Sequence, residues 1–252
     1  MGRVVLALMA GFGILLFGPF AVQAQSLQPA GWDANLKLAE ATDANPDPKI
    51  VEISLEARVA SLEIVPGVRT EAWTYNGGLP GPLIRVRRGD RLIVHFSNKL
   101  PQSTTVHWHG VQVPIQMDGV PGVSQPPVET GGSFTYDFVL PDAGLFWYHP
   151  HVMSAAQVGF GLYGALLVED PEDRVKMADQ LVMVLSDIAI DDSTGQLHSP
   201  DSGGALGGLF GREGNHVLVN GRIRPTLLLR DGALQRWRIV NSAKSRYFQL
   251  VL

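Results

Sequence analysis

The chain has 252 residues, of which 45% are hydrophobic and 17% are charged, and its formal net charge is -4. This composition excludes a chain that is disordered throughout, and the lack of a basic excess argues against nucleic acid as a partner. The 28 glycines and 17 prolines favour a turn-rich β fold over a helical one. The sequence has no cysteine, which excludes disulfide scaffolds, iron–sulfur clusters, thiol nucleophiles and any copper–thiolate site.

Residues 1–24 are typical of a secretory signal peptide. Arg3 gives a basic start, an apolar run from Val4 to Phe17 follows, and the segment ends with small residues around Ala24. An uncleaved membrane anchor is the alternative, although a Gly-Pro pair interrupts the apolar run. We therefore expect an exported protein, periplasmic or secreted, that has no membrane attachment after the signal is cleaved.

From residue 49 onward, short apolar segments of period two predict an all-β fold. Candidate strands begin near Ile50 and continue at Leu83–Arg87, Arg91–Phe96, Thr104–His109, Ser133–Leu140, Leu145–His149 and Leu162–Glu169. Turns rich in glycine, proline, asparagine and aspartate separate these segments, a spacing that is typical of a β-sandwich or barrel. A short helix is expected at Ser154–Gln157.

Part of the sequence repeats. Residues 76–98 and residues 220–241 both open with Asn-Gly, place a proline before an apolar strand, and end a second strand with asparagine. A duplicated domain explains this similarity, so we expect one domain at 49–170 and a second at 171–252. The second copy stops soon after its repeat ends, and we therefore expect the second domain to be truncated and the chain to be the N-terminal part of a longer protein.

Four of the seven histidines form two tight pairs. His107 and His109 lie in His-Trp-His-Gly, and His149 and His151 lie in His-Pro-His. Residues i and i+2 of a strand face the same side, so each pair presents two imidazoles on one face, while Trp108 points into the opposite layer. Imidazoles without a thiolate suit copper, zinc or nickel better than magnesium or calcium. The two pairs predict a metal site on which four imidazoles converge.

Asp118 follows the first pair in the sequence Met-Asp-Gly. It is either an ordinary turn residue, because Asp-Gly is a turn signal, or a carboxylate that accepts a hydrogen bond from a ligand or relays protons. The other histidines, His95, His198 and His216, are interpreted as surface, loop or locally paired residues rather than as metal ligands.

Residues of about 50–252 resemble the multicopper oxidases, in particular their laccase-like bacterial branch. The resemblance rests on Asn-Gly and Pro-Gly-Pro in 76–82, His-Trp-His-Gly at 107–110, Asp-Gly-Val at 118–120, Leu-Phe-Trp-Tyr-His-Pro-His at 145–151 and Gly-Leu-Tyr-Gly-Ala-Leu-Leu-Val at 161–168. It implies tandem cupredoxin-like domains, each a Greek-key β-sandwich, the second incomplete here. It also implies a trinuclear centre between the first and last domains, made of one type 2 copper and a type 3 pair.

The resemblance further implies a role for each site residue. By position, His107 is similar to a type 2 copper ligand, and His109 and His149 are similar to ligands of one type 3 copper. His151 is similar to a ligand of the second type 3 copper, and Asp118 to the acid that helps deliver protons to bound oxygen. In the family, a type 1 copper takes single electrons from a reductant, such as a phenol or a metal ion, and the trinuclear centre reduces O2 to two waters.

The sequence departs from the family pattern in what it lacks. The family's last cupredoxin domain supplies the other trinuclear ligands and a Cys-His type 1 site, and neither is found here. We therefore expect the N-terminal part of an exported copper oxidase, inactive alone and completed by a C-terminal domain. One alternative is a non-catalytic exported copper-binding module that uses the same four histidines. Another is a zinc hydrolase with Asp118 as its base. Copper nitrite reductases fit less well, because they carry a type 1 cysteine in the first domain.

Overall fold

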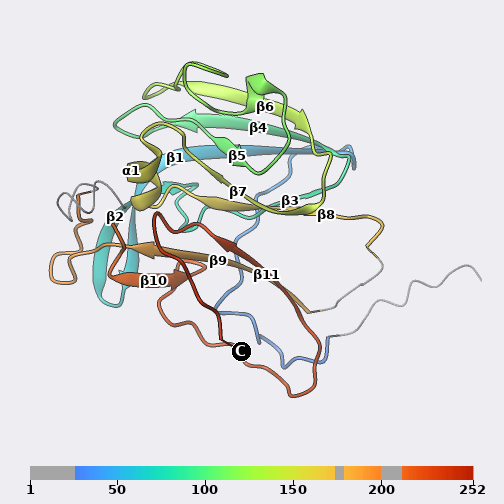
Figure 1. Ribbon diagram of the computed structural model, residues 1–252, viewed down its shortest axis with the longest axis vertical. Helices are drawn as coiled ribbons and strands as arrows, with labels where there is room; N and C mark the ends of the chain where they lie inside the picture. The colour runs from blue at the N-terminus through green and yellow to red at the C-terminus, as the bar shows by residue number, and fades with distance from the viewer. Residues whose placement is uncertain (1–25, 174–178, 200–211, 252) are drawn as a thin grey trace, which may run out of the picture.

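The computed structural model describes residues 26–173, 179–199 and 212–251, and almost all regular structure in these ranges is β (Figure 1). The predicted all-β fold is therefore confirmed. The expected signal peptide at 1–24 lies outside the described residues. In the described part of the chain, no helix is both long enough and apolar enough to cross a membrane.

The first sheet has four strands in the order β2-β1-β4-β6. The strands are β1 (Ile50–Val65), β2 (Val68–Tyr75), β4 (Arg91–Asn98) and β6 (Ser133–Val139). Strand β1 forms an antiparallel hairpin with β2 and pairs in parallel with β4. In β4, the apolar side chains of Leu92, Val94 and Phe96 are buried while Arg91 and His95 are exposed, so one face of the sheet faces the core and the other faces solvent.

The second sheet packs against that buried face and carries three of the four paired histidines. Its order is β3-β8-β7-β5, with strands β3 (Ile84–Arg87), β8 (Gly164–Glu169), β7 (Gly144–His149) and β5 (His107–His109). Trp108 from β5 and Tyr148 from β7 are fully buried in the core between the two sheets. The ring centroid of Trp108 lies 5.5 Å from that of Tyr136 of β6, so these aromatic side chains fix the position of β5 against the first sheet.

A third sheet covers part of the other face of the second sheet, which gives the molecule three layers (Figure 1). Its order is β10-β9-β11, with β9 (Gln180–Ile188), β10 (His216–Val219) and β11 (Arg236–Asn241). Strand β9 is antiparallel to β10 and parallel to β11, the same relationship that β1 has to β2 and β4. The sequence repeat therefore corresponds to the same three-stranded unit, and the domain division at 170/171 stays a prediction.

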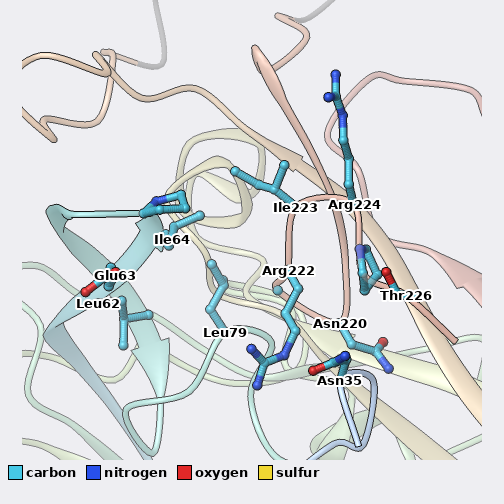
Figure 2. A pocket seen from close by; sticks show the side chains of 13 residues that line it. Asn35, Leu62, Glu63, Ile64, Leu79, Asn220, Arg222, Ile223, Arg224 and Thr226 are labelled. Atoms are coloured by element: carbon cyan, nitrogen blue, oxygen red, sulfur yellow. The ribbon is translucent and has the colours of Figure 1, made fainter. Parts of the chain in front are cut away.

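The two units meet at their Asn-Gly turns. Gly221 lies so close to the first unit that a Cβ atom there would be 1.8 Å from the carbonyl oxygen of Leu79. A pocket of about 580 Å³ lies beside this contact, between the tip of the β1–β2 hairpin and the loop after β10 (Figure 2). Ile64 and Leu79 line one side of this pocket, and Arg222 and Ile223 line the other. Glycine is thus required where one unit rests on the other.

Candidate metal centre

The register between β5 and β7 brings three histidines to one face of the second sheet. His107 lies opposite His149, and His109 lies opposite Trp147. Directly opposed residues of an antiparallel pair share a face, as do residues i and i+2 of one strand. The sequence predicted that Trp108 points into the layer opposite the histidines. This is confirmed, because Trp108 is fully buried on the opposite face.

The four predicted imidazoles converge. The ring centroid of His107 lies 5.7 Å from that of His109, 5.3 Å from that of His149 and 4.6 Å from that of His151. The His109 and His149 centroids are 5.4 Å apart. Among the described residues, His107, His109 and His149 form the one group of three possible ligands whose nitrogens all lie within 4.8 Å of one another. Strand β7 ends at His149, so His151 follows the strand after Pro150.

Main-chain hydrogen bonds decide which ring nitrogens face the centre. Nδ1 of His107 lies 2.7 Å from the carbonyl oxygen of Asp118, and Nδ1 of His149 lies 3.0 Å from that of Pro150. A carbonyl can only accept, so each Nδ1 carries the proton and each Nε2 keeps its lone pair for a metal. Nε2 of His149 also lies 3.1 Å from Nδ1 of His109. Two nitrogens bound to one tetrahedral ion at about 2.0 Å are roughly 3.3 Å apart, so this pair fits a shared ion.

The environment favours the neutral form of His109, His149 and His151. Burial, with a smaller contribution from the nearby imidazoles, lowers the pKa of His149 to about 3 against the opposing effect of its hydrogen bond to Pro150. The pKa values of His109 and His151 are also lowered, first by partial desolvation and then by the neighbouring His107. Neutral imidazole is the form that binds metals, so these three side chains need not lose a proton at neutral pH before binding one.

Asp118 lies beside His107. It follows the short 3-10 helix η1 (Ile115–Met117), and its Oδ1 is 3.3 Å from Nδ1 of His107. Its side chain is 35% exposed and so reaches both solvent and the histidine cluster. Its carbonyl oxygen is closer to the same nitrogen than its carboxylate is. The main chain of Asp118 therefore orients the ring of His107.

Three further residues stack on the cluster or hold the segment around it, and they were not predicted from the sequence. Trp147 stacks on His149, with ring centroids 4.1 Å apart and an interplanar angle of 28°. Its place two residues before His149 in one strand is the signal that could have identified it. Thr105 accepts a hydrogen bond from the main-chain N–H of His151, and Gln157, in the helix that follows His151, accepts one from the hydroxyl of Thr104. These partners are distant in the sequence and become apparent only in three dimensions.

The other described histidines with side-chain partners lie elsewhere. Nε2 of His95 is 2.7 Å from a carboxylate oxygen of Glu52 on the exposed face of the first sheet. His216 pairs with Asp192, with its Nε2 2.5 Å from a carboxylate oxygen. Both therefore have local partners, as the sequence predicted for His95, and neither is close to the four converging imidazoles.

Comparison with known proteins gives one consistent result. Residues 57–173 match the family model for multicopper oxidases. The crystal structure of a multi-copper oxidase from Pseudomonas thermotolerans is 42% identical, with a TM-score of 0.73, over 78% of this chain and 47% of that one. A second solved multicopper oxidase is 30% identical, with a TM-score of 0.65, over 82% of this chain and 68% of that one.

Among curated proteins, the multicopper oxidase MmcO of Mycobacterium tuberculosis is 31% identical over 92% of this chain and 51% of its own length. The chain thus spans about half the length of MmcO and about half of the Pseudomonas thermotolerans enzyme.

Proposed function

The chain belongs to the multicopper oxidase family, and from that premise we propose that it supplies one side of the copper centre of an exported oxidase. This oxidase couples the one-electron oxidation of a reductant, a phenol or a metal ion, to the four-electron reduction of O2 to water. The observation that carries the proposal is the convergence of His107, His109, His149 and His151.

The donor set fits copper. It consists of imidazole nitrogens with no thiolate, and within the part of the chain that the structure describes Asp118 is the one carboxylate in contact with it. Imidazole suits copper and zinc, whereas magnesium and calcium prefer oxygen. Two of the rings are already oriented by main-chain carbonyls, as metal-binding histidines usually are. Bound copper would supply one-electron transfer and a place where O2 is reduced.

The geometry supports a role for each imidazole. We assign His109 and His149 to one type 3 copper, because their facing nitrogens are 3.1 Å apart. His107, with Nε2 as its free nitrogen, is assigned to the type 2 copper, and His151 to the second type 3 copper. Four imidazoles are too few for three ions that each take two or three. The remaining ligands and the type 1 site therefore come from outside these 252 residues, and we expect the chain alone to be inactive.

Asp118 is proposed to move protons. Reduction of O2 to water consumes protons, which must reach a partly buried centre from solvent. The Asp118 carboxylate is partly exposed and lies 3.3 Å from a ring nitrogen of His107. It can take a proton from water on one side and release it towards the centre on the other. Signal-peptide cleavage after residue 24 would place this chemistry in the periplasm or outside the cell.

Copper titration of the 252-residue chain tests the site. We expect the wild type to bind Cu(II) with nitrogen hyperfine structure in its electron paramagnetic resonance spectrum. His107→Ala and His149→Ala should each weaken binding at least about tenfold. His95→Ala is the control, because it removes an exposed histidine of the first sheet. Equal affinities for all four proteins would refute the proposal, as would an absorption band at about 600 nm, which requires a copper–thiolate bond.

Reading the gene beyond codon 252 separates an oxidase from a copper-binding module. An open reading frame that runs into a His-Cys-His segment supports the oxidase, because that segment would supply the type 1 ligands. A stop codon directly after codon 252, within intact flanking DNA, supports a non-catalytic module that binds copper through the same four histidines.

A further inference from the structure

We propose that Thr105 is a positioning residue for His151. The inference rests on the proposed function, because it concerns how one of the four ligands is held. His107, His109 and His149 lie in two paired strands whose register fixes them. His151 differs, because β7 ends at His149 and the chain continues through Pro150. Its position therefore needs a contact other than the strand ladder.

The hydroxyl group of Thr105 supplies this contact. The main-chain N–H of His151 donates to Oγ1 of Thr105 over 3.2 Å, and Thr105 is fully buried. Pro150 has no N–H group, so His151 carries the first amide after β7 that can be held in this way. Within the described ranges, this is the one hydrogen bond that His151 makes.

A second contact holds the two segments together. His151 is followed by the six-residue helix α1 (Ser154–Gly159), which has no side-chain cap at its N-terminus. Such a short helix is unstable unless other parts of the protein anchor it. The fully buried side chain of Gln157 provides an anchor, because its Nε2 donates to the carbonyl of Ser103 over 2.9 Å and its Oε1 accepts from the hydroxyl of Thr104 over 2.7 Å. Residues 103–105 thus bind the His151 loop from both of its ends.

Small displacements of this loop would affect metal binding. The imidazole of His151 has its centroid 4.6 Å from that of His107, and its side chain is exposed, so packing restrains it little. A ligand set must be held within about 0.5 Å of its productive geometry. The hydrogen bond from Thr105 fixes the main chain at the residue whose ring must be placed, and losing it would move one ligand relative to the other three.

The test compares Thr105→Val with Thr105→Ser in Cu(II) titrations of the 252-residue chain. Valine keeps the shape of threonine without the hydroxyl group, and serine keeps the hydroxyl group. We expect Thr105→Val to weaken copper binding about tenfold and Thr105→Ser to retain wild-type affinity. Thr74→Val is the control, since it removes a buried threonine hydroxyl of β2 that donates to the carbonyl of Arg58.

A double-mutant cycle separates positioning of His151 from a general effect on folding. In the His151→Ala background, Thr105→Val should cause no further loss of copper affinity, because the ligand that it positions is gone. An equal loss in both backgrounds would overturn the inference. The inference would also be overturned if Thr105→Val bound copper with wild-type affinity while His107→Ala bound it weakly. That result would leave the proposed function intact.

Amide hydrogen exchange gives a readout that needs no metal. The His151 amide should exchange at least about tenfold faster in Thr105→Val than in the wild type and Thr105→Ser, because its acceptor is lost. Unchanged exchange would overturn the inference. If instead copper binding shows no dependence on His107 and His149, the proposed function fails, and exchange at His151 alone decides whether Thr105 holds this loop.

Discussion

Asn76 and Asn220 make the same hydrogen bonds in two hairpins that belong to different repeats. Both begin an Asn-Gly turn with a positive main-chain φ, 53° and 51°. Each side chain accepts a hydrogen bond from one main-chain N–H of the neighbouring long strand. It also donates a hydrogen bond to the carbonyl that lies two residues before that N–H in the same strand. The N–H groups belong to Glu56 and Val184, and the carbonyls belong to Ser54 and Val182. This shared arrangement is a structural reason for the repetition of Asn-Gly in the sequence.

The two asparagines should differ in their contribution to stability. Asn220 is 8% exposed and makes a third bond, from Nδ2 to the carbonyl of Leu36 over 2.5 Å, whereas Asn76 is exposed. We expect Asn220→Gly to lower the free energy of unfolding by about 2–4 kcal/mol and Asn76→Gly by about 1 kcal/mol, because buried partners are left unpaired only in the first. Glycine tolerates the positive φ at both sites, so urea unfolding of the two variants compares hydrogen bonds. Equal losses would contradict this expectation.

The strands that carry the histidines could be predicted from the sequence, but two others could not. Strand β9 is buried along almost its whole length, because the second sheet packs on one of its faces and the N-terminal segment around Leu36 packs on the other. It therefore lacks the period of two that identifies a half-exposed strand. In β2 the burial does alternate, but the inward side chains are Thr70, Ala72 and Thr74, which are small or polar. Their pattern therefore carries no apolar signal.

The part of the candidate site that could be predicted from the sequence is the part encoded by residues close together in the chain. A His-x-His pair needs only the period of a strand, which places both imidazoles on one face. The residues that hold the cluster depend on distant contacts, since the partners of Gln157 lie more than fifty positions away in the sequence. The sequence left two interpretations of Asp118 open, a turn residue or a carboxylate beside a metal ligand. In the structure Asp118 follows a turn and also lies next to His107, so the two interpretations are compatible.

Gly119 allows the Asp118 turn to approach β5. A Cβ atom at Gly119 would lie 1.9 Å from the carbonyl oxygen of Val106, and its φ is +74°. Gly122 has the same φ and open space around its Cβ position, which makes it a matched control. We expect Gly122→Ala to cost about 1–2 kcal/mol in unfolding free energy from backbone strain alone. Gly119→Ala should cost at least about 2 kcal/mol more, because the turn must also move. Thermal or urea unfolding measures both, and equal costs would show that the contact with β5 is not restrictive.

His149 should make the metal-free chain less stable in acid. Its pKa is about 3 in the folded protein, against an ordinary value of 6.5. Between these values the unfolded chain binds a proton that the folded chain does not, so stability falls as pH decreases below about 6.5. The contribution of this one group is at most about 1.4 kcal/mol per pH unit.

Urea unfolding at pH values from about 7 to 4.5 measures this effect. In the unfolded chain His149 titrates near the ordinary histidine pKa, so the stability at the upper end of this pH range serves as the reference. We expect the stability of His149→Gln to decrease less steeply below pH 6.5 than that of the wild type, because glutamine has no proton to bind. Parallel curves for the two proteins would show that His149 titrates normally in the fold.

Asp118→Asn should separate metal binding from proton transfer. The main-chain carbonyl of Asp118, which asparagine retains, accepts the hydrogen bond from Nδ1 of His107 over 2.7 Å. Copper affinity of the chain should therefore stay within about threefold of the wild type. In the copper-loaded full-length enzyme, O2 consumption should fall by about 10²–10⁴-fold, because the amide cannot take up and release a proton at Oδ1. A loss of affinity as large as the loss of rate would instead make Asp118 a turn residue that orients His107.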